Sequence, residues 1–412
     1  MTRSIARRAG VLAAIVLASQ PGAVSAADLE WSDAMRAAQR ASNESRYADA
    51  EQFLRTAVKE AEKFAPGDRR LDLSFSSLAY VLYSRGKHAE AERTYVQAVA
   101  ILEKTLGPEH LRVADSLMGL AAIYQMQGKY KEVEPLLHRS LAIREKLLGP
   151  DHPDVATSLS NLANSYSTQG KSAEAEILYR RAVAILEKVY GPHHILVAST
   201  LNNLGVLSGS QGNTVEAERL LKRALSIREA ALGSKHPDFA SSLKNLGAFY
   251  TSEGKPVEAE HVLKRALAIE ENVWGPEHTS VASTLGLLGA AYESQGRRAE
   301  AEPAFKRSLA IWEKALGPDG IYVAVMLRNL ARIYEDESKY PEAESLLKRS
   351  LAILEKIRGA KAPELVGDLE SYASVLRKMS RNADATEIEA RVEAIRAEHP
   401  TGESPTRAGG SQ

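Results

Sequence analysis

The chain of 412 residues contains no cysteine. This excludes disulfide bonds, thiolate metal sites and a lipid-modified cysteine behind an export signal. Its 53 basic and 53 acidic residues balance, so the chain lacks the basic excess that marks a nucleic-acid-binding surface. No apolar run reaches the roughly 20 residues of a membrane-spanning helix, so stable membrane insertion is not expected.

Sequence motifs of common enzyme sites are absent as well. The chain has no G-x-x-x-x-G-K-[ST], G-x-G-x-x-G, H-E-x-x-H or G-x-S-x-G pattern. The nearest similar stretch, "SGSQG" at 208–212, lies in a predicted turn between two helices. We therefore expect no enzymatic activity, no catalytic residues and no cofactor.

The N-terminus has the three parts of a secretory signal peptide. "MTRSIARR" is basic, "AGVLAAIVLA" is an apolar core of ten residues, and Val24-Ser25-Ala26 offers small residues for cleavage. We expect residues 1–26 to be removed after Ala26, which predicts a periplasmic or secreted protein. A signal retained as an anchor is the alternative.

The rest of the chain is organised by a period of 42 residues. One series of glycines follows this interval from Gly107 to Gly359, and a second follows it from Gly86 to Gly296. Two glycine series in phase indicate two turns per unit. Between the turns, apolar residues recur at the spacing of one helical face, as in the halves 153–168 and 172–190. Each unit is therefore predicted to be a helical hairpin that buries its apolar face against its neighbours.

Recurring small residues indicate how the hairpins pack. One position per unit is always alanine or glycine, and it would let two helix backbones approach closely. With its neighbours it forms the pattern Leu159, Leu162, Ala163, Tyr166, Ala175, Tyr179 and Ala182 in the unit from 152 to 190.

This pattern resembles the tetratricopeptide repeat, and the 42-residue period with "HPDVATSLSNLA" and "QGKSAEAE" resembles its kinesin light chain type. The resemblance implies an all-α, right-handed superhelical solenoid of stacked antiparallel helix hairpins over residues 27–397. Residues 68–358 hold the regular repeats, and 31–65 and 362–397 are degenerate end caps that complete about nine pairs. The tail 398–412 is expected to be disordered. No heptad coiled coil precedes the repeats, so a motor-subunit role is not implied.

Histidine recurs at one position in five successive linkers, namely His110, His152, His194, His236 and His278. A metal array is the functional alternative. However, equivalent residues two helices apart lie roughly 15–20 Å from each other, and zinc needs its nitrogen ligands about 2 Å from one ion. We therefore interpret these histidines as ordering the start of each first helix, and we expect no metal site.

Asparagine recurs just before the central leucine of the first helices, although it is a poor residue for a helix interior. The kinesin light chain resemblance implies that asparagines at this position hold the backbone of a bound peptide. The matching residues here are Asn161, Asn203, Asn245 and Asn329. Their amides offer both donors and an acceptor to a peptide group. The alternative, which does not exclude the first, is that they only bond neighbouring helices.

Cations accompany two of these asparagines: Lys244 precedes Asn245, and Arg328 and Arg332 flank Asn329. Cations beside amides favour a carboxylate, so the partner would be an acidic peptide or a free chain terminus. Together these features predict a scaffold that binds an extended peptide or a partner protein in the concave groove of the solenoid. The alternative is a structural or self-assembling envelope component that uses its outer face and its ends; the oligomeric state is open.

Overall fold

The computed structural model describes residues 25–44, 46–65 and 67–399, and in these residues it contains helices and no strand. The described residues form eighteen α-helices, which follow one another as successive pairs joined by short turns. The prediction of a solenoid of helical hairpins is confirmed. The chain divides into two compact units, 1–211 and 212–412, which we call the N-terminal and the C-terminal unit.

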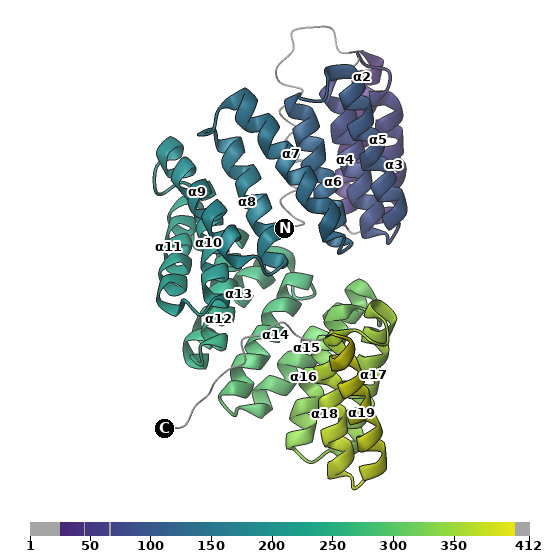
Figure 1. The fold of residues 1–412 in the computed structure, drawn as a ribbon, viewed down its shortest axis with the longest axis vertical. Coiled ribbons are helices and arrows are strands. Elements are labelled where there is room, and N and C mark those ends of the chain that lie inside the picture. Colours follow the sequence, from purple (N-terminus) through teal and green to yellow (C-terminus); the bar gives the residue numbers. More distant parts are fainter. Residues whose placement is uncertain (1–24, 45, 66, 400–412) are drawn as a thin grey trace. The chain divides into compact units, whose positions relative to one another are not determined.

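In the N-terminal unit the helices are coloured from purple at α2 to teal at α10 (Figure 1). The degenerate first pair predicted at 31–65 begins earlier than expected, at Ala26. The helices of this unit are α2 (Ala26–Asn43), α3 (Tyr47–Ala61), α4 (Arg69–Ser84), α5 (His88–Leu106), α6 (Leu111–Met126), α7 (Tyr130–Leu148), α8 (Pro153–Thr168), α9 (Ser172–Tyr190) and α10 (Ile195–Ser210).

The C-terminal unit continues the same alternation of 16-residue and 19-residue helices. In its last hairpin the first helix is shorter and follows a short 3-10 helix. Its elements are α11 (Thr214–Leu232), α12 (Pro237–Ser252), α13 (Pro256–Trp274), α14 (Thr279–Ser294), α15 (Arg298–Leu316), α16 (Ile321–Asp336), α17 (Tyr340–Arg358), η1 (Pro363–Leu365), α18 (Val366–Lys378) and α19 (Asn382–Glu398).

The apolar face predicted for each hairpin is buried. In α8, Val155, Leu159 and Leu162 are almost inaccessible to solvent, and Tyr179 in α9 is buried as well. The small residues act as predicted where two helices of a hairpin cross. A Cβ atom added to Gly247 would lie 2.5 Å from Cγ of Leu263, so α12 and α13 could not pack this closely around a larger residue.

Serine at another small position adds a bond that the size argument did not predict. The hydroxyl of Ser140 on α7 donates to the carbonyl of Ala114 on α6 at 2.8 Å. Ser308 bonds Ala282 in the same way at 2.7 Å. These buried hydroxyls hold the second helix of a pair to the backbone of the first.

The linker histidines cap the first helices, which confirms their structural interpretation. In α8, Nδ1 of His152 accepts from the backbone N–H of Asp154 at 3.1 Å, and Pro153 occupies the first helical position. The same bond recurs at His110, His194, His236 and His278. No group of three potential metal ligands exists among the described residues.

The turn inside each hairpin needs a residue in the left-handed conformation. Gly170 meets this need with φ +77°. In the last two hairpins serine takes the place of glycine, and Ser338 and Ser380 have φ of 59° and 62°. A side chain in this region costs conformational energy, so these two turns are strained.

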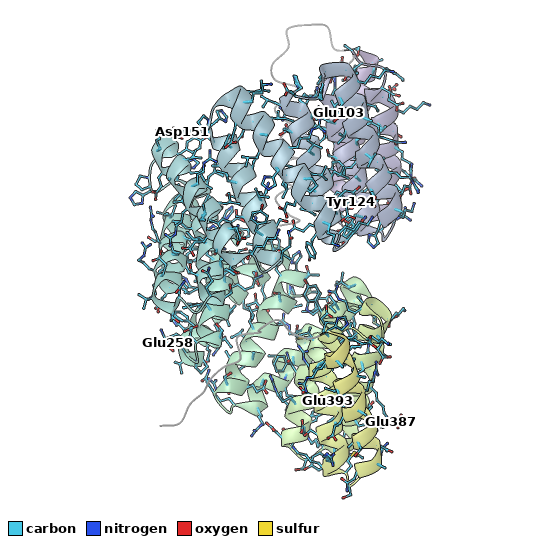
Figure 2. The ribbon with its side chains drawn as sticks, in the orientation of Figure 1. Glu103, Tyr124, Asp151, Glu258, Glu387 and Glu393 are labelled. Carbon is cyan, nitrogen blue, oxygen red and sulfur yellow. The ribbon has the colours of Figure 1, made fainter. Side chains whose placement is uncertain are left out.

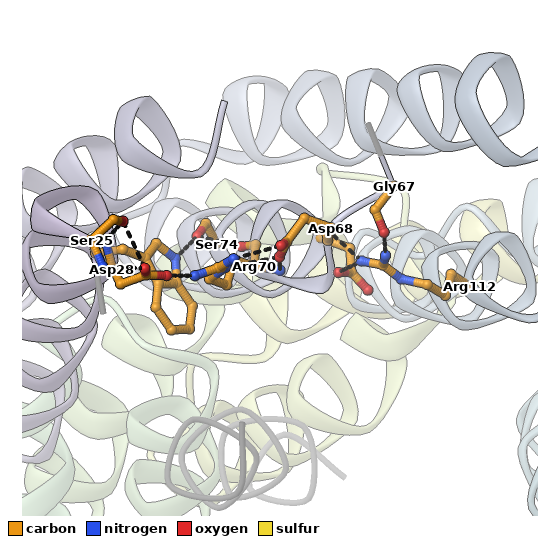
Figure 3. A network of polar contacts seen from close by, with 9 residues as sticks. Ser25, Asp28, Gly67, Asp68, Arg70, Ser74 and Arg112 are labelled. Carbon is orange, nitrogen blue, oxygen red and sulfur yellow. Dashed lines mark hydrogen bonds and ion pairs between the residues drawn. The ribbon is translucent and has the colours of Figure 1, made fainter. Parts of the chain in front are cut away.

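A polar network fixes the start of the N-terminal unit (Figure 3). Ser25 and Asp28 cap each other at the beginning of α2, and the carboxylate of Asp28 also pairs with Arg70 on α4. The indole of Trp31 donates to Ser74 at 2.8 Å. Cleavage after Ala26, as predicted, would remove the capping Ser25 and leave the pair between Asp28 and Arg70.

Two predicted segments fall largely outside the described residues. These are the signal peptide at 1–26, of which the structure describes only Ser25 and Ala26, and the tail at 398–412, of which it describes Glu398 and His399. In the described part of the chain, none of the helices has the length and apolar character needed to cross a membrane.

A candidate partner-binding face on the first helices

The predicted asparagines lie half-buried on their first helices, in both units. In the N-terminal unit, the amide nitrogen of Asn203 on α10 donates to Oδ1 of Asn164 on α8 at 3.3 Å. The amide of Asn161 faces the sulfur of Met118 at 3.8 Å, a long and weak contact. These bonds link neighbouring first helices, yet they leave the side-chain carbonyl of Asn203 and one of its N–H groups available.

Asn164 is the residue that the sequence argument missed. Its carbonyl accepts from both Asn203 and the hydroxyl of Tyr179 on α9, so it joins two hairpins. The signal was present in "NLANSY", where a second asparagine follows Asn161 by three residues and so lies on the same helical face.

In the C-terminal unit Asn245 and Asn329 occupy the equivalent position on α12 and α16. Asn329 makes no hydrogen bond with any residue that the structure describes, although its side chain is half-buried. A half-buried amide without a protein partner is open to a ligand. Beside it on α14, Leu287 and Ala290 are partly exposed, but Gly286 is covered by the side chain of Met326.

The predicted cations are engaged within the protein. Lys244 lies 3.3 Å from Oε1 of Glu270, whose side chain is fully buried, and Thr284 donates to the other oxygen of Glu270 at 2.5 Å. Lys244 itself is only 20% exposed. A buried carboxylate without a counter-charge is strongly unfavourable, so the first role of Lys244 is to neutralise Glu270.

Arg328 has a comparable partner. Its Nη1 donates to Oδ1 of Asp368 at 2.9 Å, and the carboxylate of Asp368 is buried on α18. Arg332 donates through two nitrogens to Glu293 on α14. The two arginine side chains remain 41% and 56% exposed, and each guanidinium has further N–H groups. They can therefore still donate to a second acceptor, whereas Lys244 is much less accessible.

Away from this face, ion pairs tie successive second helices together. Arg181 on α9 donates to Oε1 of Glu145 on α7 at 2.7 Å, and it also reaches the carbonyl of Pro150 in the linker. The same link between repeats is made by the arginines at 139, 265, 307, 349 and 391 with the glutamates at 103, 229, 271, 313 and 355. Glu103, which pairs with Arg139, is labelled in Figure 2.

A second set of contacts surrounds a glutamate near the start of the second helices. The hydroxyl of Tyr250 donates to Glu218 at 3.1 Å, and Lys222 and Lys255 also bond this carboxylate. These two lysines lower the pKa of Glu218 to about 2. Glu134 in the N-terminal unit has the same tyrosine and turn lysine, Tyr166 and Lys171, and they lower its pKa too.

Seven overlapping segments of the chain match the family model for the tetratricopeptide repeat. They cover 70–144, 113–188, 169–230, 196–272, 238–314, 280–356 and 322–398. The chain belongs to the tetratricopeptide repeat family. No curated protein sequence matches the chain.

Solved structures with a similar fold include further tetratricopeptide repeat proteins. The repeats of a putative kinesin light chain from Podosopora anserina are 30% identical over 50% of this chain and 97% of that chain, with a TM-score of 0.44. BtubC from P. vanneervenii is 24% identical over 57% and 92%, with a TM-score of 0.48. The apo form of the quorum sensor NprR from B. thuringiensis is 14% identical over 89% and 97%, with a TM-score of 0.60, a likeness of fold alone. The neighbours therefore include kinesin light chain-like proteins, as the sequence predicted.

Proposed function

We propose that this tetratricopeptide repeat protein is a scaffold, without catalytic activity, that binds an extended peptide or a partner protein on the face of its first helices. The observation that carries the proposal is the row of half-buried amides at one repeat position, including Asn329 with no hydrogen bond to any described residue. Helix-interior asparagine gives up helix propensity, and recognition of a peptide backbone would offset this cost.

In this proposal Asn161 and Asn203 contact the partner in the N-terminal unit, and Asn245 and Asn329 do so in the C-terminal unit. Each amide can donate to a peptide carbonyl and accept from a peptide N–H. An extended chain presents both groups at regular intervals and leaves them unpaired. Recognition of this kind depends on the shape of the backbone more than on the side chains of the peptide.

Charge selectivity comes mainly from Arg328 and Arg332, with a smaller contribution from Lys244. The two arginines keep exposed N–H groups after pairing with Asp368 and Glu293. An acidic side chain or a chain-terminal carboxylate would satisfy those donors with strong hydrogen bonds. We further propose that the protein acts in the periplasm or outside the cell, because residues 1–26 have the pattern of a cleaved signal peptide.

The experiment is a pull-down with the full chain, followed by affinity measurement with the recovered peptide. We expect Asn203→Ala combined with Asn245→Ala to weaken binding at least tenfold. The matched control is Asn213→Ala with Asn272→Ala, which removes two exposed asparagines that lie off the first helices. An affinity within twofold of the wild type for the first pair would refute the assignment of this face. Arg332→Gln should weaken an acidic peptide more than a neutral one.

A structural role is the second candidate, and one observation favours it. Large apolar side chains recur in exposed positions near the ends of second helices, with Leu147 and Val189 in the N-terminal unit and Val273 and Ile357 in the C-terminal unit. Repeated exposed apolar residues are typical of contact surfaces. Sedimentation of the purified chain over a hundredfold concentration range tests this role, since a constant monomer would exclude self-assembly.

A further inference from the structure

Five consecutive first helices, α6 to α14, begin with the same histidine cap. In each, Nδ1 of the imidazole accepts the backbone N–H two residues further on. The distances are 3.2 Å at His110, 3.1 Å at His152, 3.3 Å at His194, 3.1 Å at His236 and 3.1 Å at His278. Histidine is not among the residues that usually cap helices, which are Ser, Thr, Asp and Asn.

The bond itself fixes the protonation state of these rings. A backbone N–H can only donate, so Nδ1 must carry its lone pair and the proton must lie on Nε2. A doubly protonated imidazole has no acceptor. Histidine side chains generally take up a second proton near pH 6.5, and that proton would occupy the atom that caps the helix.

Protonation would also place a positive charge at the positive end of the helix dipole, which is unfavourable. Two rings have a nearby carboxylate that would partly compensate: Asp154 lies 3.7 Å from Nδ1 of His152, and Asp238 lies 3.8 Å from that of His236. At the other three helix starts the equivalent residue is not acidic: Arg112, Leu196 and Ser280 stand there.

The neighbouring second helices bring mainly cations to these linkers. The guanidiniums of Arg139, Arg181 and Arg307 bond the carbonyls of Pro108, Pro150 and Pro276, two residues before a cap histidine. Near His236, Arg228 bonds the carbonyl of Asp238, and Arg265 covers the ring of Phe239. The linker carboxylates Glu109, Asp151 and Glu277 are paired with Lys146, Lys188 and Lys314. The rings of Tyr190 and Trp274 stack on His194 and His278.

The ends of the chain provide an internal contrast. Asp68 caps α4 at the same repeat position, with its carboxylate accepting from the N–H of Arg70 at 2.9 Å. Ser25 caps α2, and Gly320 begins α16 with no side-chain cap. None of these three helix starts depends on a group that titrates near pH 6.5. The fold therefore accepts a cap that mild acid does not remove.

We propose that the five cap histidines form an acid-sensitive device that loosens α6, α8, α10, α12 and α14 in mild acid, because a doubly protonated ring cannot accept the capping N–H. The sign follows from the bond: the folded chain needs the neutral rings, so their stabilisation is present while the rings are neutral and is lost on acidification. Three of the caps lie in the N-terminal unit and two in the C-terminal unit, so acid weakens the N-terminal unit more. The device does not depend on the proposed partner-binding role.

The test compares the thermal unfolding of the full chain at pH 7.5 and pH 5.5 with that of a variant carrying His→Asp at all five positions. Each lost cap is expected to lower Tm by roughly 2–4 °C. For five caps we expect a fall on the order of 10–20 °C in the wild type, and less than about 2 °C in the variant, because aspartate stays ionised at pH 5.5. Equal falls in both proteins would overturn the proposal.

Three further measurements support this comparison. His261→Asn removes a histidine inside the second helix α13, away from the caps, and it should leave the pH dependence of Tm unchanged. If the fivefold variant does not fold, His194→Asp alone should reduce the acid-induced fall by about one cap. Nitrogen NMR of the imidazoles then reports the capped state directly: Nδ1 of His194 must be unprotonated at pH 7.5, and a protonated Nδ1 there would refute the proposal.

Discussion

The two units differ at the repeat position of the first helix that directly precedes the recurrent asparagine. In the N-terminal unit this position holds Ser160 on α8, whose hydroxyl bonds only the carbonyl of Ala156 in its own helix. In the C-terminal unit it holds Lys244 and Arg328, and each compensates a buried carboxylate. The N-terminal face is therefore built from neutral groups, whereas the C-terminal face is built over buried charge.

This difference shows that a charged residue on a binding face does not by itself indicate a charged ligand. Lys244 was predicted to attract a carboxylate, and the structure supplies that carboxylate as Glu270 on the neighbouring α13. A substitution of Ser160 leaves no buried charge without a partner, whereas a substitution of Lys244 or Arg328 leaves a buried carboxylate without its counter-charge. Four predictions test this contrast, beginning with the largest effect.

Lys244→Met should destabilise the C-terminal unit by about 3–5 kcal/mol, because Glu270 would remain buried without a counter-charge. Adding Glu270→Leu should recover most of the loss. The matched change in the N-terminal unit, Ser160→Ala, should cost under about 0.5 kcal/mol. Urea unfolding followed by circular dichroism measures all three, and similar losses for Lys244→Met and Ser160→Ala would contradict the contrast.

The hairpin crossings differ as well. Gly247→Ala should cost about 1–3 kcal/mol, since the new methyl group would overlap Leu263 on α13. The equivalent residue in the N-terminal unit is Ala163, which already carries a Cβ and is fully buried. Ala163→Gly should therefore cost only about 1 kcal/mol, from lost helix propensity. The free energy of unfolding of both variants decides whether the crossing in the C-terminal unit is tighter.

Exchanging serine and glycine in the turn inside a hairpin should change the free energy of unfolding in opposite directions in the two units. Ser338→Gly relieves a side chain held at φ 59°, so it should raise the unfolding free energy of the C-terminal unit by about 1 kcal/mol. Gly170→Ser introduces the same strain at φ +77° in the N-terminal unit and should lower stability by a similar amount. Differential scanning calorimetry checks both, and a loss of stability for Ser338→Gly would show that the serine is not strained.

The smallest expected effect is on how the free energy of unfolding depends on pH in acid. The depressed pKa of Glu218, about 2, means that its ion pairs contribute stability above the ordinary glutamate value near 4.3, and that this is lost as the pH falls toward 2. Lys222→Ala should remove part of this dependence, worth about 0.5 kcal/mol at the surface. In the N-terminal unit His138 stands at the position of Lys222, so His138→Ala offers the matched comparison. Unfolding measured at pH 5 and pH 3 distinguishes the two.

Much of the fold could be predicted from the sequence because the same turn residues and apolar positions recur in every repeat. The period of 42 residues, the glycine turns and the apolar faces follow from local rules of helix formation, and the structure confirms the hairpins. The recurrent asparagines could also be recognised in the sequence, because the 42-residue period and the resemblance of "SNLANSY" to the family motif are enough to identify their position.

The sequence by itself determined the class of fold, the helix starts and the buried face of each helix, since these depend on neighbours three or four positions apart. Only the tertiary structure decided which charges meet. Glu270 and Lys244 lie 26 positions apart, as do Ser140 and Ala114, and no local rule pairs them. Whether a polar side chain is open to a partner or already occupied depends on the packing of successive helices, and that packing alone separates Asn329 from Lys244.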